Sequence, residues 1–577
     1  MSLPCPLCHQ PFTIGKDETA FLEKMTFTFG KTVVHPAEPK ECPACRLKIR
    51  TAHRNERFLY RRKSDLSGKG IVAIFHPEPM RPCTVYAHDE WHSDKWDAIT
   101  YGRAYDFGRS FFDQFFDLQS AVPKMAVVTV GNENCEFTTG TGYCKNCYLI
   151  NSSEYCEDCC YGKLFQKCRS CYDCSYIFDS ELCSQCFSVY NCYQCRFLSF
   201  SKNCNDCQFS LSLLSCKNCF LCSNLERKEY CFRNKQLSKQ DYAREIAAYT
   251  DSYEKQQEAL AELELLQAKS IHRAANILNS EDCTGDYLEN SKNCHECFDV
   301  SDSQDCTRVT VGVSTKDCFD CSNMYIKPEL CFMTLGTIEA YNTAYSLYVF
   351  HSQNILYSEN CFHSKDLFGC CGLKHKQYCI LNTQYTKQEY EELVPRIIEH
   401  MKKTPYQLSA DGAAMNPSGA SGSWGQYFPQ HFSPFGYNES VAHEYMPLTK
   451  EEATAMGFHW RETKDEIPEA KKIIAARDLP DRTSDVPDDV LNWAITCCVS
   501  GRPYKLQKAE LNFYRQQSLP IPREHPDVRY DHRMRLKNAR TLWQRTCDKC
   551  GKKTMSTFAE GRSERIYCEE CYSEAAG

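Results

Sequence analysis

The sequence predicts a mainly β protein with some α-helix, built from two tandem β-solenoids between duplicated zinc-ribbon-like modules. Three observations predict this architecture: cysteines recur every twelve residues over two long stretches, helix-start signals follow each stretch, and Cys-x-x-Cys pairs stand near both ends. We expect five regions, which are an N-terminal module with a connector, two cysteine-repeat solenoids each with a capping helix, a Gly/Ser/Pro-rich linker with a short helix, and a C-terminal module. These regions span residues 1–131, 132–270, 271–404, 405–487 and 488–577.

The composition narrows the class of protein. A chain of 577 residues is too long for one hydrophobic core. The net charge of -7 excludes a uniformly basic surface but not a local basic patch. The 41 cysteines indicate either a secreted disulfide scaffold or an intracellular thiol and metal protein. Met1-Ser-Leu-Pro leads straight into Cys5 without a signal-like apolar stretch, and no segment has the ~20 apolar residues of a membrane helix, so we expect a cytoplasmic protein that contacts no membrane.

The first cysteine array has a strict period of twelve residues, so it is interpreted as a repeat architecture before any local motif. Its main column is Cys135, Cys147, Cys159, Cys171, Cys183, Cys195, Cys207, Cys219 and Cys231. A second column lies three residues earlier, at Cys144, Cys156, Cys168, Cys192, Cys204 and Cys216, with Ser180 in its one gap.

Twelve residues are too few for a helical repeat and suit one small β-solenoid coil with two short strands and two tight corners. The interior is then about one side-chain layer thick, and thiols of neighbouring coils stack ~4.8 Å apart. Both cysteines of a Cys-x-x-Cys pair can face inward only if the chain turns between them. We therefore expect a corner within each pair.

A second array begins at Cys283, and both arrays span 96 residues from first to last cysteine. Each is followed by a predicted helix: Ser238 with Asp241, and Thr386 with Glu389, resemble capping boxes. The first helix is predicted to run through Glu258–Leu266. Such helices can cover the open end of a solenoid.

Three chemistries could explain the cysteine columns: a reduced thiol core, metal or iron–sulfur binding between rungs, and disulfides. In the second array the main column reads Cys331, Thr343, Ile355, Leu367, Cys379, and Val309 replaces an earlier cysteine. Apolar replacements favour a core-filling role over an obligatory ligand. They also favour a solenoid over the alternative of a string of small zinc knuckles.

Both ends of the chain carry the ligands of a four-thiolate zinc site. The predicted ligands are Cys5, Cys8, Cys42 and Cys45 at the N-terminal end, and Cys547, Cys550, Cys568 and Cys571 at the C-terminal end. Two Cys-x-x-Cys knuckles satisfy tetrahedral zinc and leave no position for a substrate. We expect two zinc ions, both structural, and no catalytic residues.

The two end modules align with each other, without gaps from Cys42 to Gly68. His525-Pro-Asp-Val-Arg529 matches Cys42-Pro-Ala-Cys-Arg46, and Ser64-Asp-Leu-Ser-Gly68 matches Cys547-Asp-Lys-Cys-Gly551. Each copy is interpreted as two tandem ribbons, of which one has lost its ligands. His88-Asp-Glu-Trp-His92 resembles a metalloprotease helix, but Tyr86–Glu90 aligns with Tyr567–Cys571, which favours a decayed knuckle. Cys83 and the pair Cys497-Cys498 are interpreted as packed or vestigial.

The segment shared by the modules is basic and contains aromatic residues. Basic groups beside aromatics can bind phosphates and stack on bases, whereas the alternative is a helix face that balances the acidic solenoid or contacts protein. The candidate nucleic-acid-binding residues are Arg46, Arg50, Arg54, Arg57, Arg61 and Arg62, and in the second copy Arg533, Lys537, Arg540 and Arg545.

Residues 404–440 are rich in Gly, Ser and Pro and are interpreted as a linker, and Leu448–Gly457 predicts one short helix stopped by glycine. Several segments resemble a cysteine-rich family of candidate-phylum (Patescibacteria-like) bacteria for which no activity is established. They are Arg54–Arg57, Trp91–Trp96, Glu281–Asp286, Gly372–Cys379 and Ser433–Asn438. The resemblance implies a cytoplasmic bacterial protein. Members often carry a CaiB/BaiF label, which implies a CoA-transferase with an aspartate nucleophile on an α/β fold.

The leading functional hypothesis is a non-enzymatic scaffold whose basic zinc modules bind nucleic acid, RNA rather than duplex DNA, with protein partners along the solenoid as a further expectation. A second hypothesis makes the cysteine columns a metal-thiolate or iron–sulfur reservoir. A third is the CoA-transferase implied by the family label.

Overall fold

The computed structural model describes residues 3–408, 414–415, 422–462 and 468–576. The chain forms two compact units. Unit 1 comprises residues 1–126, 275–461 and 539–542, and unit 2 comprises residues 127–274, 462–538 and 543–577. Each unit therefore combines one solenoid with segments from distant parts of the sequence: the N-terminal module belongs with the second solenoid, and the C-terminal segments belong with the first.

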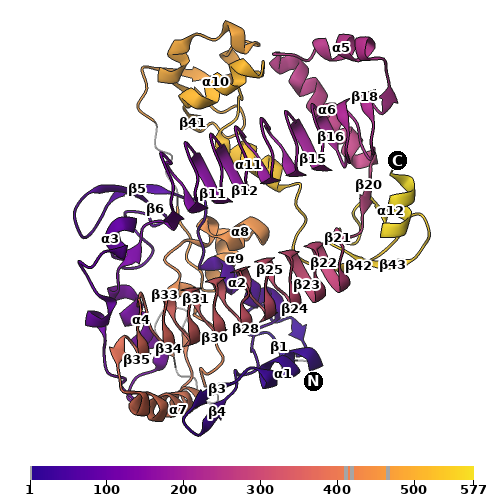
Figure 1. Cartoon of the computed structure of the whole chain (residues 1–577). Helices are drawn as coiled ribbons and strands as arrows, with labels where there is room; N and C mark the ends of the chain where they lie inside the picture. The colour runs from indigo at the N-terminus through magenta and orange to yellow at the C-terminus, as the bar shows by residue number, and fades with distance from the viewer. Residues whose placement is uncertain (1–2, 409–413, 416–421, 463–467, 577) are drawn as a thin grey trace. The chain divides into compact units, whose positions relative to one another are not determined.

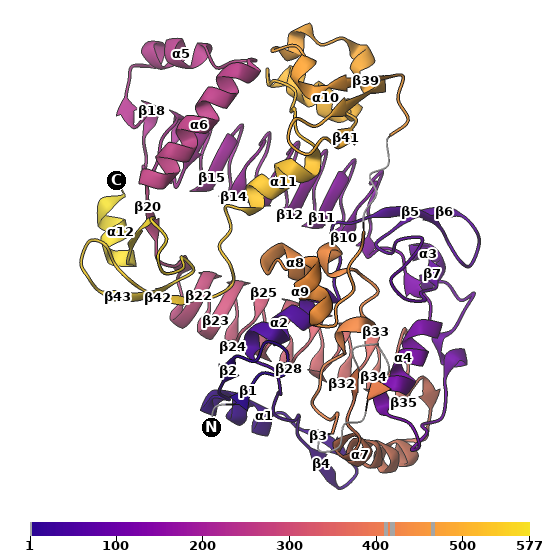
Figure 2. The same cartoon turned by 180° about the vertical axis from the view of Figure 1, so that it is seen from behind.

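The first solenoid lies in unit 2 and has the predicted coil of twelve residues, since Thr139 pairs with Asn151 and Cys219 with Cys231 in parallel. Figures 1 and 2 show its strands stacked as successive coils. They are β9 (Thr129–Val130), β10 (Thr139–Gly142), β11 (Tyr148–Glu154), β12 (Cys160–Gln166), β13 (Ser175–Phe178), β14 (Phe187–Tyr190), β15 (Arg196–Lys202), β16 (Gln208–Leu211), β17 (Lys217–Phe220) and β18 (Glu229–Phe232), closed by the antiparallel β19 (Lys235–Gln236).

Each coil has four corners, so the prediction of two corners was wrong. Within one coil Tyr143, Asn146, Leu149 and Ser152 have left-handed φ of 54, 54, 51 and 50°, and such residues recur every third position along both solenoids. Left-handed backbone turns the chain after each three-residue side, and the residue after the corner points inward. The predicted corner inside each Cys-x-x-Cys pair is confirmed, as at Asn146 between Cys144 and Cys147.

The second solenoid lies in unit 1 and follows the same plan. Its main column pairs in register from Cys331 through Thr343, Ile355 and Leu367 to Cys379, as the sequence predicts. Its strands are β21 (Ile277–Leu278), β22 (Glu281–Glu289), β23 (Lys292–Ser301), β24 (Gln304–Thr307), β25 (Thr310–Val313), β26 (Lys316–Phe319), β27 (Ser322–Tyr325), β28 (Glu329–Phe332), β29 (Leu335–Ile338), β30 (Tyr341–Ala344), β31 (Leu347–Phe350), β32 (Gln353–Leu356), β33 (Glu359–Phe362), β34 (Lys365–Phe368), β35 (Gln377–Ile380) and the antiparallel β36 (Thr383–Gln384).

The cysteines of the columns form the solenoid cores. In the first solenoid they pack in one buried cluster with Ile150, Phe165, Ile177, Val189 and Leu198. All 41 cysteines lie in the described part of the chain and carry free thiols. Every column thiol donates to the carbonyl two residues before it, as Cys171 Sγ does to Arg169 O at 3.3 Å. Serines at inward positions make the same bond, so thiol and hydroxyl are interchangeable in this frame.

A helix follows each solenoid as predicted, but the first is interrupted at residues 248–252 and does not run on from Ser238 through Glu258–Leu266. Ser238 caps α5 (Lys239–Ala247), which α6 (Tyr253–Lys269) follows, and Thr386 with Glu389 forms the capping box of α7 (Lys387–Lys403). Tyr242 of α5 packs with Phe220 and Phe232 from the last coils of the first solenoid, and Tyr390 of α7 lies beside Tyr378 of β35. Both helices cover the ends of their solenoids, which leaves no apolar rung open there.

The remaining helices and strands of unit 1 come from the chain segments on either side of the second solenoid. They are β1 (Leu3–Pro4), β2 (Pro11–Phe12), α1 (Lys16–Lys24), β3 (Phe27–Phe29), β4 (Thr32–Val34), α2 (Pro43–Ala52), β5 (Tyr60–Lys63), β6 (Gly70–Ala73), β7 (Val85–Tyr86), α3 (His88–His92), α4 (Phe111–Ala121), β8 (Lys124–Met125), β37 (Gln407–Leu408), β38 (Ala414–Met415), α8 (Val441–Tyr445) and α9 (Lys450–Ala455). The last is the short helix predicted before Gly457, which has a φ of 83°.

The predicted linker is only partly described, because residues 409–413 and 416–421 lie outside the described residues. Its second half is not a linker. Trp424, Tyr427, Phe428 and Phe432 are buried in the main core of unit 1, where Phe428 stacks on Phe115 of α4 at 4.9 Å between ring centroids. The aromatic residues between the small ones explain this difference. The free energy gained by burying four large rings exceeds the conformational entropy that the glycines and serines lose on ordering.

The remaining elements of unit 2 are short. They are β20 (Ile271–Arg273), β39 (Lys472–Ala475), β40 (Trp493–Thr496), β41 (Pro503–Tyr504), α10 (Lys508–Gln516), α11 (Pro526–Met534), β42 (Trp543–Thr546), β43 (Lys553–Ser556), β44 (Arg565–Tyr567) and α12 (Glu569–Ala575). Strand β44 pairs with β20, which ties the C-terminal module to the segment that follows the first solenoid.

Candidate metal centres

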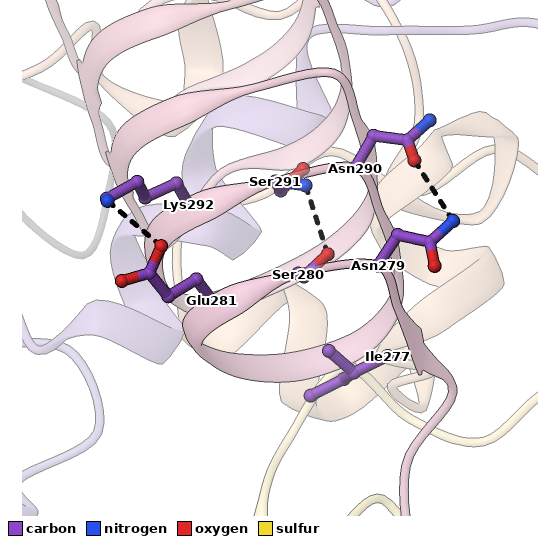
Figure 3. Close-up of a pocket in the computed structure, with 7 residues that line it drawn as sticks. All are labelled: Ile277, Asn279, Ser280, Glu281, Asn290, Ser291 and Lys292. Atoms are coloured by element: carbon purple, nitrogen blue, oxygen red, sulfur yellow. Dashed lines mark hydrogen bonds and ion pairs between the residues drawn. The ribbon is translucent and has the colours of Figure 1, made fainter.

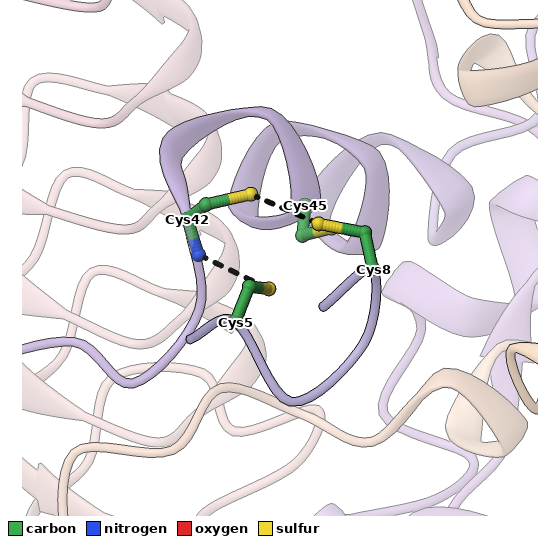
Figure 4. A group of neighbouring side chains, drawn as sticks. All are labelled: Cys5, Cys8, Cys42 and Cys45. Atoms are coloured by element: carbon green, nitrogen blue, oxygen red, sulfur yellow. Dashed lines mark hydrogen bonds between the residues drawn. The ribbon is translucent and has the colours of Figure 1, made fainter. Parts of the chain in front are cut away.

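The N-terminal cluster brings the four predicted cysteines together from two local structures (Figure 4). Cys5 and Cys8 lie on the turn between β1 and β2, which closes through the amide of His9 donating to Cys5 O at 2.9 Å. Cys42 caps α2, whose first residue is Pro43, and Cys45 lies in the first turn. The four Sγ atoms all lie within 4.8 Å of one another, so one tetrahedral ion can bind all of them.

The thiols of this cluster are electrostatically coupled. The hydrogen bond between the side chains of Cys42 and Cys45 lowers the pKa of Cys42 to about 5 and raises the pKa of Cys45. Burial raises the pKa of Cys8. Cys8 Sγ and Cys42 Sγ are 3.6 Å apart. Four sulfurs this close cannot all ionise without a cation, and a metal ion bound between them would supply that charge.

The C-terminal cluster repeats this construction. Cys547 and Cys550 lie on the turn between β42 and β43 and precede Gly551, which has a φ of 76°, and Cys568 caps α12. Burial opposes ionisation of Cys547, but bonds from the amides of Cys550, Cys568 and Lys549 lower its pKa to about 6. The Sγ atoms again lie within 4.8 Å of one another.

The two clusters are the only such groups of cysteine, histidine and acidic residues in the described parts of the chain. They consist of the eight cysteines that the sequence predicts as metal ligands. Each set offers four donors of one kind and can hold a metal ion.

The ribbon that aligns with the C-terminal cluster has lost its ligands in the N-terminal copy. Ser64 Oγ donates to the carboxylate of Glu90, and the amide of Ala87 donates to Ser64 Oγ at 3.3 Å. The amide of Cys568 likewise donates to Cys547 Sγ at 3.3 Å. Glu90 therefore completes a hydrogen-bonded knuckle, and its carboxylate is engaged there rather than beside a metal held by His88 and His92.

The other lost ribbon is in the C-terminal copy. Cys497 occupies the place of Cys5, and its Sγ accepts from the amides of Val499 and Ser500 at 3.4 Å each. His525 is the N-cap of α11 as Cys42 is of α2, but His525 Nδ1 accepts from the amide of Asp527 at 3.1 Å, whereas Cys42 makes no side-chain capping bond. The knuckle backbone has thus persisted at Cys497 although the four-thiol set has not.

The structure buries three of the predicted nucleic-acid-binding arginines, Arg46, Arg50 and Arg533. Arg46 is fully buried, and its guanidinium lies 2.9 Å from Glu18 of α1 and 2.7 Å from Asp320 of the second solenoid. Arg50, one helical turn further along α2, is also buried. These two side chains are enclosed by their own unit and present no group to a phosphate.

The second copy makes the equivalent contact in unit 2. Arg529, which aligns with Arg46, forms an ion pair with Asp173 of the first solenoid and lies 3.3 Å from Glu510 of α10. Arg533 is also buried, 3.4 Å from Asp173. Asp173 and Asp320 occupy the same place in their solenoids, in Cys171-Tyr-Asp-Cys174 and Cys318-Phe-Asp-Cys321. The prediction of a nucleic-acid contact through Arg46, Arg50 and Arg533 is therefore replaced by a docking role.

The other predicted basic residues are engaged to different degrees. Arg54 pairs with Glu56, Arg62 with Asp65 at 2.9 Å, and Arg540 with Asp299 at 2.8 Å. The ammonium of Lys537 lies 3.6 Å from the ring centre of Tyr176, and Arg545 donates to the carbonyls of Phe558 and Ala559. Of the last two, Arg57 is half-buried and Arg61 is exposed.

A hollow of about 560 Å³ opens at the first coils of the second solenoid (Figure 3). Asn279 and Asn290, Ser280 and Ser291, and Glu281 and Lys292 pair across the two coils that line it. Its polar groups are satisfied by one another, so it presents no convergent set of binding groups.

None of the described helices has an apolar run that could cross a bilayer; the longest, α6 and α7, carry charged residues along their whole length. Compared with known proteins, the chain matches no family model and no curated protein.

Proposed function

We propose that the protein is a non-catalytic binding scaffold with two structural zinc ions, one in each unit. The observation that carries the proposal is the pair of four-cysteine clusters whose donor atoms all lie within 4.8 Å of one another. Four thiolates saturate tetrahedral zinc, so such an ion stabilises a fold and offers no open position to a substrate. The free thiols throughout the solenoids support a reducing compartment such as the cytoplasm.

Metal analysis tests this proposal. Native mass spectrometry of protein purified without oxygen is expected to give two zinc ions per chain. Cys42→Ser and Cys568→Ser are each expected to lose one ion, because three thiolates bind far more weakly than four. Cys498→Ser is the matched control, since its exposed thiol belongs to neither cluster. Full zinc content in either cluster variant would contradict the proposal.

Nucleic acid remains our proposed partner, with RNA favoured, but through a different surface. In β5 the side chains of Arg61 and Lys63 lie on one exposed face, since alternate residues of a strand share a face. Two basic groups on an exposed hairpin can contact phosphates, whereas the buried arginines of α2 and α11 cannot.

Filter binding of single-stranded RNA across a salt series tests this surface. The variant Arg61→Ala/Lys63→Ala is expected to weaken binding and to lower the slope of log K against log salt by roughly 1–2. Lys31→Ala, in the exposed turn between β3 and β4, is the control and should bind as the parent does. A parent protein that binds no RNA at low salt would overturn the nucleic-acid proposal and leave the zinc scaffold intact.

A further inference from the structure

The main cysteine column of the first solenoid is unbroken over nine coils. Eight of its nine members, from Cys147 to Cys231, are at most 2% exposed, and only Cys135 at the first end is half-buried. Each follows a left-handed corner residue and points into the core. The column is therefore a single file of sulfurs that begins near solvent and runs through the core of unit 2.

The fold itself does not require thiols at these positions. In the second solenoid the equivalent column holds Thr343, Ile355 and Leu367, all fully buried and in the same parallel register. A coil of this shape accepts β-branched and larger apolar side chains there. Packing alone does not explain an uninterrupted run of nine cysteines, whereas a chemistry that needs sulfur on every rung does.

The sulfurs of this column can bind an ion as neighbouring pairs, but they do not form cages of four donors. Parallel strands place neighbouring rungs ~4.8 Å apart. Within the described residues, only the two end clusters gather three or more donor atoms within 4.8 Å of one another. Zinc and iron–sulfur clusters need such cages, whereas a soft monovalent ion can bind linearly between two thiolates.

We propose that the column from Cys135 to Cys231 is a binding site for Cu(I), with one ion in each gap between the sulfurs of successive coils. Nine cysteines enclose eight gaps. Each interior sulfur bridges two ions, and each ion bridges two sulfurs, so a filled column is one chain of alternating sulfur and copper. This site is separate from the zinc clusters and does not depend on the proposed scaffold function.

Charge balance favours this arrangement in a buried core. Eight Cu(I) ions replace eight thiol protons, which leave to solvent, while one terminal cysteine keeps its proton. The filled column is then neutral, so the large cost of burying net charge is avoided. No oxidant or reductant is needed, because copper stays monovalent and sulfur stays thiolate.

Loss of the thiol protons leaves no backbone carbonyl without a partner. Arg169 O, which accepts from Cys171 Sγ, also accepts from the amide of Leu182 at 3.1 Å. Glu181 O, which accepts from Cys183 Sγ, likewise accepts from the amide of Gln194 at 3.0 Å. The coil ladder therefore remains satisfied when copper replaces hydrogen, and filling the column does not oppose the fold.

The test is anaerobic titration of the zinc-loaded full chain with Cu(I) against a competing chelator, with zinc retention counted in the same samples. Up to eight equivalents are expected to bind without release of zinc, and X-ray absorption should show two sulfur neighbours per copper ion. The key variant is Cys183→Ser in mid-column. It should lose about two equivalents, because one oxygen interrupts the two gaps on either side of it.

Folding of this variant is secured by a native precedent. Ser180 replaces cysteine in the neighbouring column, where its hydroxyl donates to Phe178 O at 2.7 Å and accepts from the amide of Cys192 at 3.0 Å. Cys160→Ser is the matched control, since Cys160 is equally buried but packs outward against residues of the 476–521 segment. It should keep the full stoichiometry. Copper that binds only as zinc leaves, or equal binding by both variants, would overturn the proposal.

Discussion

Arg46 and Arg529 occupy the same position in two copies of one module, and each is buried against two carboxylates of its own unit. One carboxylate comes from the preceding helix, as Glu18 or Glu510, and one from a solenoid corner, as Asp320 or Asp173. Burying charge is costly unless the partners are close and well placed, so such a cluster holds a fixed geometry. Both modules therefore dock on their solenoids through one duplicated ionic contact.

Replacing Arg529 by methionine tests this contact. The variant leaves Asp173 and Glu510 buried with Arg533 as the remaining cation, and we expect the free energy of unfolding to fall by roughly 3–5 kcal/mol. Urea denaturation followed by fluorescence measures it. Arg477→Ala is the control in the same unit: this exposed arginine lies 4.0 Å from Asp478, and its loss should change stability by less than about 0.5 kcal/mol. Equal effects of the two substitutions would refute the docking role.

At the scale of the solenoid coil, the backbone of each corner limits which residues fit. Left-handed φ costs an L-residue about 1–2 kcal/mol, and Asn, Asp and Gly adopt it most readily. Fewer than half of the described corners hold one of these residues, and among the others Ile326 has a φ of 59° and a side chain that is 48% exposed. Its branched side chain gains little from burial, so the strain of its backbone is not offset by packing.

Ile326→Asn is therefore expected to stabilise unit 1 by about 1 kcal/mol. The measurement is the urea midpoint of unfolding at constant slope. Val313→Asn is the matched control, since Val313 is another exposed apolar residue of the same solenoid but lies outside the left-handed corners. That control should be neutral or slightly destabilising. A gain from both substitutions would indicate a general effect of surface polarity instead.

Four features could be predicted because each depends on the spacing of residues that are close in the sequence: the repeat period, the inward columns, the helix caps and the eight clustered cysteines. The four-cornered coil could not. Cys-x-x-Cys marks the corner between two columns, but the other two columns mix residues of every size, such as Ile150, Gly162, Ser153 and Phe165, and so hide their corners. The ion pairs of Arg529 with Asp173 and Glu510 could not be predicted for another reason. Asp173 lies far from Arg529 in the sequence, and an arginine-rich helix resembles a phosphate-binding surface when the carboxylates that pair with it are not identified.

At the scale of the whole molecule, the two units differ in their buried histidines. In unit 1, burial lowers the pKa of His53 and His431 to about 4 each. His459 shifts in the same direction for the same reason. In unit 2, burial lowers the pKa of His272. Since these imidazoles are buried in their neutral form, acid should act more strongly on unit 1.

The sign of the effect follows from proton linkage at His53. Its pKa is about 4 in the folded chain and about 6.5 in the unfolded chain, so below pH 6.5 the unfolded state takes up the proton first. The stability that the neutral ring supports is complete above about pH 6.5 and is lost as the pH falls toward 4. At pH 5 this residue alone costs unit 1 about 2 kcal/mol.

Hydrogen exchange at pH 7 and pH 5, corrected for the intrinsic exchange rate, can resolve the two solenoids within one sample. Protection of strands β29–β34 is expected to fall more steeply than protection of β12–β17. His53→Phe should remove part of the difference, because phenylalanine preserves the edge-on contacts with Tyr427 and Phe428, whose ring centroids both lie 6.2 Å from the imidazole, but cannot be protonated. If both solenoids lose protection to the same extent, and the variant does so too, then acid acts through titratable groups that are present in both units and not through the buried imidazole.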